Sequence, residues 1–339
     1  MHKHSKTKAK LLTLIAAAVS ATLLSSCDKK EYVITEFPID KELKAEPIKQ
    51  LDSLVNAYNI VSNGETYVVQ TAGTEYNFRA YDSSFKELNT FGHTGNGHDE
   101  WRSAYPSGQT TKDKDGNLFY VMETTAHKMY TLPLDGKGQR KEVADFDIKD
   151  AFGMKYAFEI APGRFAGAID DDNEYKFTIF DNKTKNKTEF PHPDFKFFLK
   201  SRMTSQILMQ TRGTYNVKAE KIATTYFSYP LVVIRDTEGN IIHTMQIGDK
   251  WPEYNEQSAA EMRVTFLGCT SDEDYVYALY DDTTRPKESS ILMFKWDGAP
   301  VARYHIDKAR AFAVDSKNKR FIVLKADDSH GACNAYSFK

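Results

Sequence analysis

The sequence predicts an all-β fold, a six-bladed β-propeller of four-stranded antiparallel blades, from three observations. Short runs rich in Tyr, Phe, Val and Ile alternate with polar residues along most of the chain, and helical spacing is rare. A unit of strand, polar turn, strand, tight turn and third strand recurs six times. The acids that close its middle strand recur about 45 to 60 residues apart, the length of a four-stranded blade with its loops. These acids are Asp82, Asp135, Asp181, Asp236 and Asp297.

Each unit forms an antiparallel meander with two hydrophobic faces, which a single copy cannot bury. Packing the copies face to face around an axis buries both faces, and closing the ring removes its open ends. The units begin at residues 65, 115, 163, 221, 274 and 319. Six copies therefore predict six blades.

The last copy lacks an outer strand, and a segment near the N-terminus is expected to supply it. Residues 31–37, EYVITEF, alternate like a strand and have no hairpin partner. We predict that this segment joins the last blade and closes the ring; the alternative is a loose tether. Residues 40–59 are predicted to be a polar connector with a short helical turn over residues 51–58, LDSLVNAY. Residues 248–263 are predicted to be an insertion with one helix from Asn255.

The N-terminus has the features of a lipoprotein signal. Four lysines lie in the first ten residues, followed by an apolar run too short to span a bilayer, and then by Leu-Ser-Ser-Cys. This order resembles the bacterial lipobox, which implies that Cys27 is acylated after cleavage; the alternative is an ordinary secretory signal. The predicted division is residues 1–26 as signal peptide, 27–59 as lipid anchor, closing strand and connector, and 60–339 as propeller.

Charge and cysteine content restrict the partners and the chemistry. The chain has 45 Lys and Arg against 47 Asp and Glu; removal of residues 1–26, with four lysines and no acid, leaves 41 against 47, a net charge of −6. An acidic chain disfavours nucleic acid as a partner. Cys269 and Cys333 remain, and two unpaired buried thiols are favoured over a disulfide.

The loop FGHTGNGHDEW, residues 91–101, raises three alternatives: a phosphate cradle, a metal site or a corner of the chain. A dinucleotide fingerprint needs a helix after the glycines, but here both neighbouring segments are strands. His93, His98 and Asp99 are weak candidates for binding, since one loop does not supply a convergent ligand set. We favour a corner, with the glycines at positive φ and Glu100 accepting backbone N–H bonds.

This loop also carries a resemblance to a known group of proteins. Phe91, Gly92, Gly95, Gly97, Glu100 and Trp101 resemble the F-G-x-x-G-x-G-P-x-E-aromatic pattern of six-bladed propeller lipoproteins of gut Gram-negative bacteria, a TolB-like or NHL-like group. His98 stands where the pattern has proline. The start of the next blade, Asp113, Gly116, Asn117 and Leu118, matches as well. The resemblance implies a propeller, lipidation and export, and it implies no reaction.

Two further sets of residues are candidate sites. Asp170, Asp171 and Asp172 lie in a predicted hairpin turn; they are weak candidates for calcium, although a solvated acidic turn is the common case. Trp101, Trp251 and Tyr254 lie in loops, where an exposed ring can stack on a sugar or grip a peptide; packing over the blade ends is an equal alternative.

The sequence contains no G-x-S-x-G motif, and no catalytic residue is assigned. We expect a lipid-anchored protein of the cell envelope, held at the outer membrane and facing the periplasm or the surface. Its propeller is expected to bind a small molecule, a glycan or a protein. One alternative is a calcium-dependent lactonase or lyase with an axial metal, because related propellers hold calcium there. The other is a structural scaffold.

Overall fold

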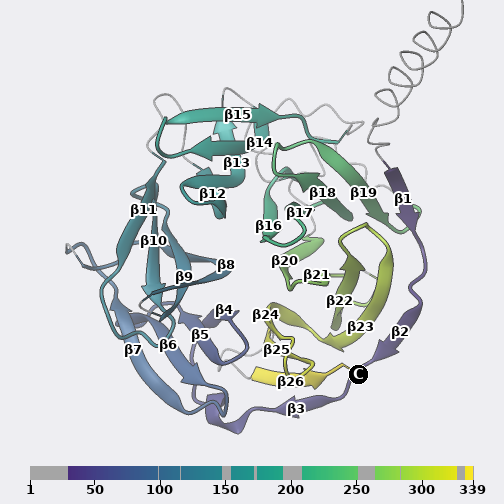
Figure 1. Cartoon of the computed structure of the whole chain (residues 1–339). Coiled ribbons are helices and arrows are strands. Elements are labelled where there is room, and N and C mark those ends of the chain that lie inside the picture. The colour runs from purple at the N-terminus through teal and green to yellow at the C-terminus, as the bar shows by residue number, and fades with distance from the viewer. Residues whose placement is uncertain are drawn as a thin grey trace, which may run out of the picture.

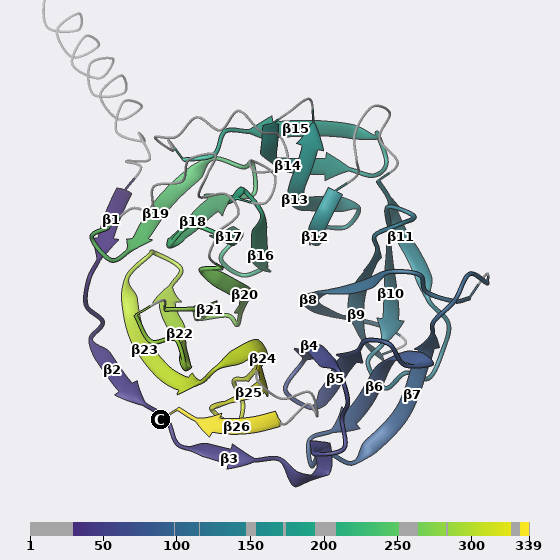
Figure 2. The ribbon, with the colours of Figure 1, turned by 180° about the vertical axis from the view of Figure 1, so that it is seen from behind.

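The computed structural model of the chain is a six-bladed β-propeller, which confirms the predicted fold class (Figures 1 and 2). Six sheets stand around a central axis, each with its first strand innermost. The structure describes residues 30–97, 99–114, 116–146, 154–171, 174–193, 208–250, 264–282, 284–326 and 333–338.

Each predicted unit forms strands two to four of a blade, and an additional strand precedes it at the axis. Blade 1 comprises β4 (Ala57–Ser62), β5 (Thr66–Thr71), β6 (Tyr76–Asp82) and β7 (Glu87–His93). Blade 2 comprises β8 (Ala104–Asp113), β9 (Gly116–Glu123), β10 (Lys128–Pro133) and β11 (Lys141–Asp145). Blade 3 comprises β12 (Met154–Ala161), β13 (Arg164–Asp171), β14 (Glu174–Asp181) and β15 (Asn186–Phe190).

The second half of the ring repeats this order. Blade 4 comprises β16 (Thr211–Asn216), β17 (Lys221–Tyr226), β18 (Leu231–Asp236) and β19 (Ile241–Ile247). Blade 5 comprises β20 (Phe266–Ser271), β21 (Tyr275–Tyr280), β22 (Glu288–Lys295) and β23 (Pro300–Asp307). Blade 6 receives β24 (Ala309–Asp315), β25 (Arg320–Lys325) and β26 (Cys333–Ser337) from the end of the chain.

An N-terminal strand completes blade 6, but it is not the predicted one. β3 (Ala45–Pro47) pairs antiparallel with β26, with Glu46 opposite Ala335. The prediction that residues 31–37 fill this place is wrong. β1 (Lys30–Ile34) pairs parallel with β19 of blade 4, and β2 (Ile39–Glu42) pairs parallel with β23 of blade 5. Residues 30–47, which contain β1, β2 and β3, thus follow the outer rim of blades 4, 5 and 6 in turn (Figure 1).

Burial between blades 4 and 5 accounts for this path. Ile34 and Phe37 are buried in one cluster with Met245 and Phe294, and the Phe37 ring meets the Phe294 ring edge-on at 5.7 Å. An alternating pattern marks a half-buried strand without indicating the edge to which it belongs. The signal in residues 31–37 therefore fits blade 4 as well as blade 6.

Residues 40–59 are a structured part of the ring rather than a plain connector. They contain most of β2, all of β3, the 3₁₀ helix η1 (Lys49–Leu51) and the start of β4. The helical turn expected over residues 51–58 lies earlier, at Lys49–Leu51, and Leu51 and Leu54 are buried in the cluster between blades 6 and 1. The helix expected from Asn255 lies outside the described residues.

The recurring acids of the sequence shape the turns between the third and fourth strands. Asp82, Asp135, Asp181, Asp236 and Asp297 each accept at least one backbone N–H bond within their own turn. Hydrogen bonds to a charged carboxylate lower its pKa. The largest such effect comes from the Ser84 side chain at Asp82 and from the Thr184 backbone N–H at Asp181, and the pKa of both acids is lowered. The regular spacing of these acids in the sequence therefore reflects the regular spacing of the turns that they stabilise.

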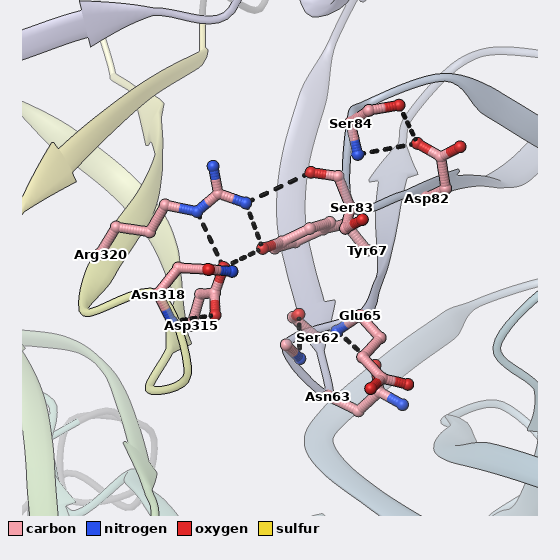
Figure 3. A network of polar contacts seen from close by, with 11 residues as sticks. Ser62, Asn63, Glu65, Tyr67, Asp82, Ser83, Ser84, Asp315, Asn318 and Arg320 are labelled. Atoms are coloured by element: carbon pink, nitrogen blue, oxygen red, sulfur yellow. Dashed lines mark hydrogen bonds and ion pairs between the residues drawn. The ribbon is translucent and has the colours of Figure 1, made fainter.

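A buried polar network joins blade 6 to blade 1, where the ring closes (Figure 3). Asp315, at the end of β24, is fully buried and accepts bonds from Tyr67 Oη at 2.7 Å and Arg320 Nε at 2.8 Å. The Asn318 backbone N–H and side-chain amide donate to the same carboxylate at 3.0 and 2.8 Å. Burial raises the pKa of Asp315, but these bonds outweigh it and hold that pKa below its ordinary value.

The axial cavity as candidate functional site

The innermost strands of the six blades form a closed ring around the axis. β4 contacts β8, and contacts continue through β12, β16, β20 and β24 back to β4. All six strands line one cavity of about 90 Å³. This volume is well below the roughly 300–1,000 Å³ of pockets that enclose a drug-sized ligand. The cavity therefore has room for an ion or for one end of a larger molecule.

The lining of the cavity is polar and has a positive charge. Arg212 of β16 is the charged side chain among the lining residues that the structure describes, and that lining includes no carboxylate. Tyr105, Ser107, Tyr156, Thr270 and Ser271 contribute hydroxyl groups. A single buried cation acts strongly here, because charges are poorly screened away from bulk water.

Two tyrosine rings hold the Arg212 guanidinium by its face. The Arg212 Cζ atom lies 3.3 Å from the centroid of the Tyr156 ring and 5.3 Å from that of Tyr105. The two rings meet each other edge-on at 4.8 Å. Stacking of this kind stabilises a buried guanidinium and fixes its plane, in which its N–H donors point.

A local backbone distortion places Tyr156 against this arginine. Tyr156 has a φ of 53°, in the left-handed region, and lies where the register of β12 against β13 shifts between Lys155 and Phe158. A bulge redirects side chains, and a bulky residue at positive φ costs about 1 to 3 kcal/mol. Such strain at a cavity is typical of functional sites.

Tyr105 and Tyr58, on two of the inner strands, are neutral at physiological pH. Burial raises the pKa of Tyr105, and the nearby Arg212 charge lowers it by less. Burial, with a smaller contribution from Tyr105, raises the pKa of Tyr58 to about 12. Protonated phenols keep their donor hydrogens, so Tyr105 adds a donor to the cavity rather than a negative charge.

The two cysteines are unpaired, as the sequence predicted. Cys269 lines the axial cavity and Cys333 is buried between blades 6 and 1. Burial raises the pKa of each thiol to about 12. Both groups are therefore protonated and unreactive at neutral pH.

The glycine loop, residues 91–101, forms a corner between blades 1 and 2, which is the alternative that the sequence analysis favoured. Glu100 Oε2 accepts the Gly97 backbone N–H at 2.6 Å, which confirms the predicted role of this carboxylate. A Cβ atom on Gly95 would lie 2.0 Å from Glu100 Oε2. The prediction of positive φ holds for Gly92, with a φ of +73°, and is wrong for Gly95 and Gly97. A Cβ atom on Gly92 would lie 2.6 Å from the Phe78 ring. The glycines make room for these side chains.

Among the described residues of the loop, the binding candidates form no group of three or more that could hold a metal. His93 is half-exposed and lies 3.5 Å from Glu75 and 3.4 Å from Glu100. Asp99 is exposed. The prediction of an exposed Trp101 ring is wrong, since the side chain is 1% exposed. The ring meets Tyr130 edge-on at 5.3 Å and is covered by Arg140 at 4.8 Å, the packed alternative of the sequence analysis.

Several candidates fall outside the described residues. These are Cys27, His98, Asp172, Trp251 and Tyr254. The backbones of Asp170 and Asp171 pair with Tyr175 and Glu174 in the β13–β14 hairpin. In the part of the chain that the structure describes, no group of three or more His, Cys, Asp or Glu is arranged to hold a metal. Nor is any helix there long and apolar enough to cross a bilayer.

The sequence analysis missed Tyr105, Tyr156 and Arg212. They come from three different inner strands, two of which, β8 and β16, lack the apolar alternation of the rest of the blade. One signal was present: β8, β16 and β20 each contain a glycine, which in a strand often marks a close approach of backbones. A Cβ atom on Gly213 would lie 2.3 Å from the Phe158 ring.

Comparisons with known proteins reveal likenesses of structure. A member of the DUF4221 family from Bacteroides vulgatus superposes with a TM-score of 0.56 at 11% identity, over 88% of this chain and 98% of that chain. A candidate exported protein from Bacteroides fragilis gives 0.54 at 10% identity, over 91% and 98%. A calcium-binding regucalcin from Agrobacterium tumefaciens gives 0.49 at 9% identity, over 88% and 95%.

No protein-family model matches the chain, and no curated protein matches it in sequence. At such low identities the structural matches establish the propeller fold alone. The chemistry of the cavity has to be argued from its own residues.

Proposed function

We propose that the mature chain, residues 27–339, is a lipid-anchored propeller of the cell envelope that binds a ligand or partner at its axial cavity. We assign no reaction to it. The observation that carries the binding proposal is the convergence of all six inner strands on one polar, positively charged cavity. A strained tyrosine and a half-buried arginine at that place are the arrangement expected of a binding site rather than of simple packing.

The N-terminal features support the envelope location. A charged segment, an apolar run and Leu-Ser-Ser-Cys follow one another in the order of a lipoprotein signal. The likeness to a candidate exported protein is consistent with export.

The path of the chain from the lipid gives the proposed orientation. β1 begins at Lys30, three residues after Cys27, and three extended residues span about 10 Å. An acylated Cys27 would thus hold the outer edge of blade 4 close to the bilayer. Tyr32 and Val33 on that edge are 37% and 61% exposed, so they would lie beside the lipid head groups.

The calcium-dependent lactonase or lyase is not favoured by the cavity. Ca²⁺ is bound by six to eight oxygen ligands, with carboxylates prominent among them. The described lining of the cavity offers an arginine and no carboxylate, and a cation next to Arg212 would be repelled.

Cell fractionation tests the anchor. We expect the wild-type chain in the membrane fraction, labelled by an alkynyl palmitate analogue, and the Cys27→Ser variant without label. A label that persists on Cys27→Ser, or wild-type chain found entirely in the soluble fraction, would contradict the lipid anchor.

Native mass spectrometry tests binding at the axis. The mature chain purified from its own envelope should carry an additional bound mass. Ser107→Trp, which fills the cavity, should abolish that mass, and Ser53→Trp at an exposed position should not. A bound mass that survives Ser107→Trp would place binding elsewhere and would favour the scaffold alternative.

A further inference from the structure

The axial cavity has the features of an anion site. This inference rests on the proposed function and specifies the class of ligand. The mature chain has a formal charge of −6, yet the described residues that line its axis include one cation and no acid. A positive cavity within an acidic protein attracts and retains anions, because its field is focused by the surrounding low-dielectric walls.

The geometry around Arg212 favours a planar or tetrahedral oxyanion. Tyr156 stacks on the guanidinium at 3.3 Å and Tyr105 lies at 5.3 Å, so the plane of the N–H donors is set before any ligand enters. Guanidinium donors match the oxygens of carboxylates and phosphates, and preorganised donors lose little entropy on binding.

Hydroxyl donors complete the lining on other sides. Ser107 of β8 and Thr270 of β20 line the same cavity as Arg212 of β16. Gly108, with a φ of +84°, has no atom within 4 Å of the place where a Cβ would be, so the chain leaves space beside Ser107. Hydroxyl groups donate to an anion while an arginine neutralises its charge.

The size of the cavity limits the ligand. About 90 Å³ accommodates a small oxyanion or the charged end of a longer molecule, but not a whole sugar or peptide. We propose that the axial cavity binds a small oxyanion, a phosphate, sulfate or carboxylate group, through the Arg212 guanidinium, which packs over the Tyr156 ring and beside the Tyr105 ring.

Calorimetric titration of the mature lipoprotein in a neutral detergent tests this proposal. Sodium phosphate, sodium sulfate and sodium acetate are the probes, at constant ionic strength. At least one should bind with one-to-one stoichiometry, and Arg212→Gln should weaken that binding at least tenfold. Arg212→Lys, which keeps the charge, should weaken it less. Arg79→Gln, at an arginine on blade 1 paired with Glu87, should leave it unchanged.

Titration with glucose 6-phosphate distinguishes a site for a free anion from a site for the charged end of a larger ligand. Binding of both phosphate and the sugar phosphate indicates a site for the end of a larger ligand, and binding of phosphate alone indicates an enclosed ion site; either supports the proposal. No binding of any probe, or binding unchanged by Arg212→Gln, overturns it.

A crystal soaked in selenate keeps the test decisive if Arg212→Gln fails to fold. An anomalous peak beside Arg212 in the wild-type protein is expected, and peaks confined to the outer surface would overturn the proposal. The titration uses solubilised protein, so its failure would leave the lipid anchor of Cys27 and the binding of another class of ligand untouched.

Discussion

Removal of the Asp315 carboxylate should weaken the ring where it closes. Asp315→Ala takes away the acceptor of Tyr67 Oη and Arg320 Nε, so the hydrogen of the buried Tyr67 hydroxyl loses its acceptor, although the oxygen still accepts a bond from Arg320 Nη2. Breaking a buried ion pair costs about 3 to 5 kcal/mol. The Arg320 side chain is 22% exposed and regains some water, so we expect a loss of about 2 to 4 kcal/mol of unfolding free energy.

A double-mutant cycle isolates the contact between the two blades. Tyr67→Phe keeps the ring against Phe85 but loses two bonds to charged groups, the one donated to Asp315 and the one accepted from Arg320 Nη2, at a cost of at least about 1.5 to 3 kcal/mol. Because each change removes the same bond, the double variant should lose less than the sum, with a coupling of about 1 kcal/mol. Urea unfolding of residues 27–339, followed by fluorescence, measures all four proteins. Additive losses, or an Asp315→Ala variant within 0.5 kcal/mol of wild type, would refute the reasoning.

The same network predicts the response to acid. The pKa of Asp315 is below its ordinary value of 3.8 in the folded chain, so its contribution is present above that pH and is lost as the pH falls through the folded pKa. Below about pH 4 the unfolding free energy of Asp315→Asn should therefore fall less steeply than that of the wild type. Parallel curves for the two proteins would contradict the assignment.

Three more predictions concern other parts of the molecule. Gly92→Ala should lower the free energy of unfolding by about 2 to 5 kcal/mol, since it places a Cβ at positive φ against the buried Phe78 ring. A urea midpoint equal to that of the wild type would contradict this. Cys333 should react with iodoacetamide at pH 8 far more slowly in the folded chain than in urea, because it is buried and its pKa is raised to about 12; equal rates would contradict its burial. Deletion of residues 28–44 removes β1 and β2 but keeps β3, so the protein should unfold at a lower urea concentration in a transition that remains cooperative. Loss of the cooperative transition would contradict this and would show that β1 and β2 are essential to the folded ring.

The blades were predictable because their signal is local. In runs such as Lys221–Tyr226 and Leu231–Asp236 the strand pattern, the turn acid and the period of the repeat agree. The inner strands gave a weaker signal, since they face a polar axis. Thr211–Asn216 is one example, with Thr, Arg, Gly and Asn among its six residues.

The path of the N-terminal segment and the axial site were not predictable for a different reason. Both depend on contacts between distant segments. Phe37 is buried against Phe294, and Tyr156 stacks on Arg212 from another blade. The two alternatives for Trp101 could not be decided for the same reason, because Arg140, which covers its ring, lies just before the fourth strand of the following blade. Local patterns identify elements, whereas the site arises from their arrangement around the axis.

A disulfide trap tests most directly the claim that β3 closes the ring. With Cys269 and Cys333 replaced by Ala, the pair Glu46→Cys and Ala335→Cys faces across β3 and β26. Facing residues of an antiparallel pair have Cα atoms about 4.5 to 5.5 Å apart, within the range of a disulfide. Mild oxidation should join positions 46 and 335, as detected by mass spectrometry of the digested protein. A bond between Val33→Cys and Ala335→Cys, with none between 46 and 335, would contradict this closure.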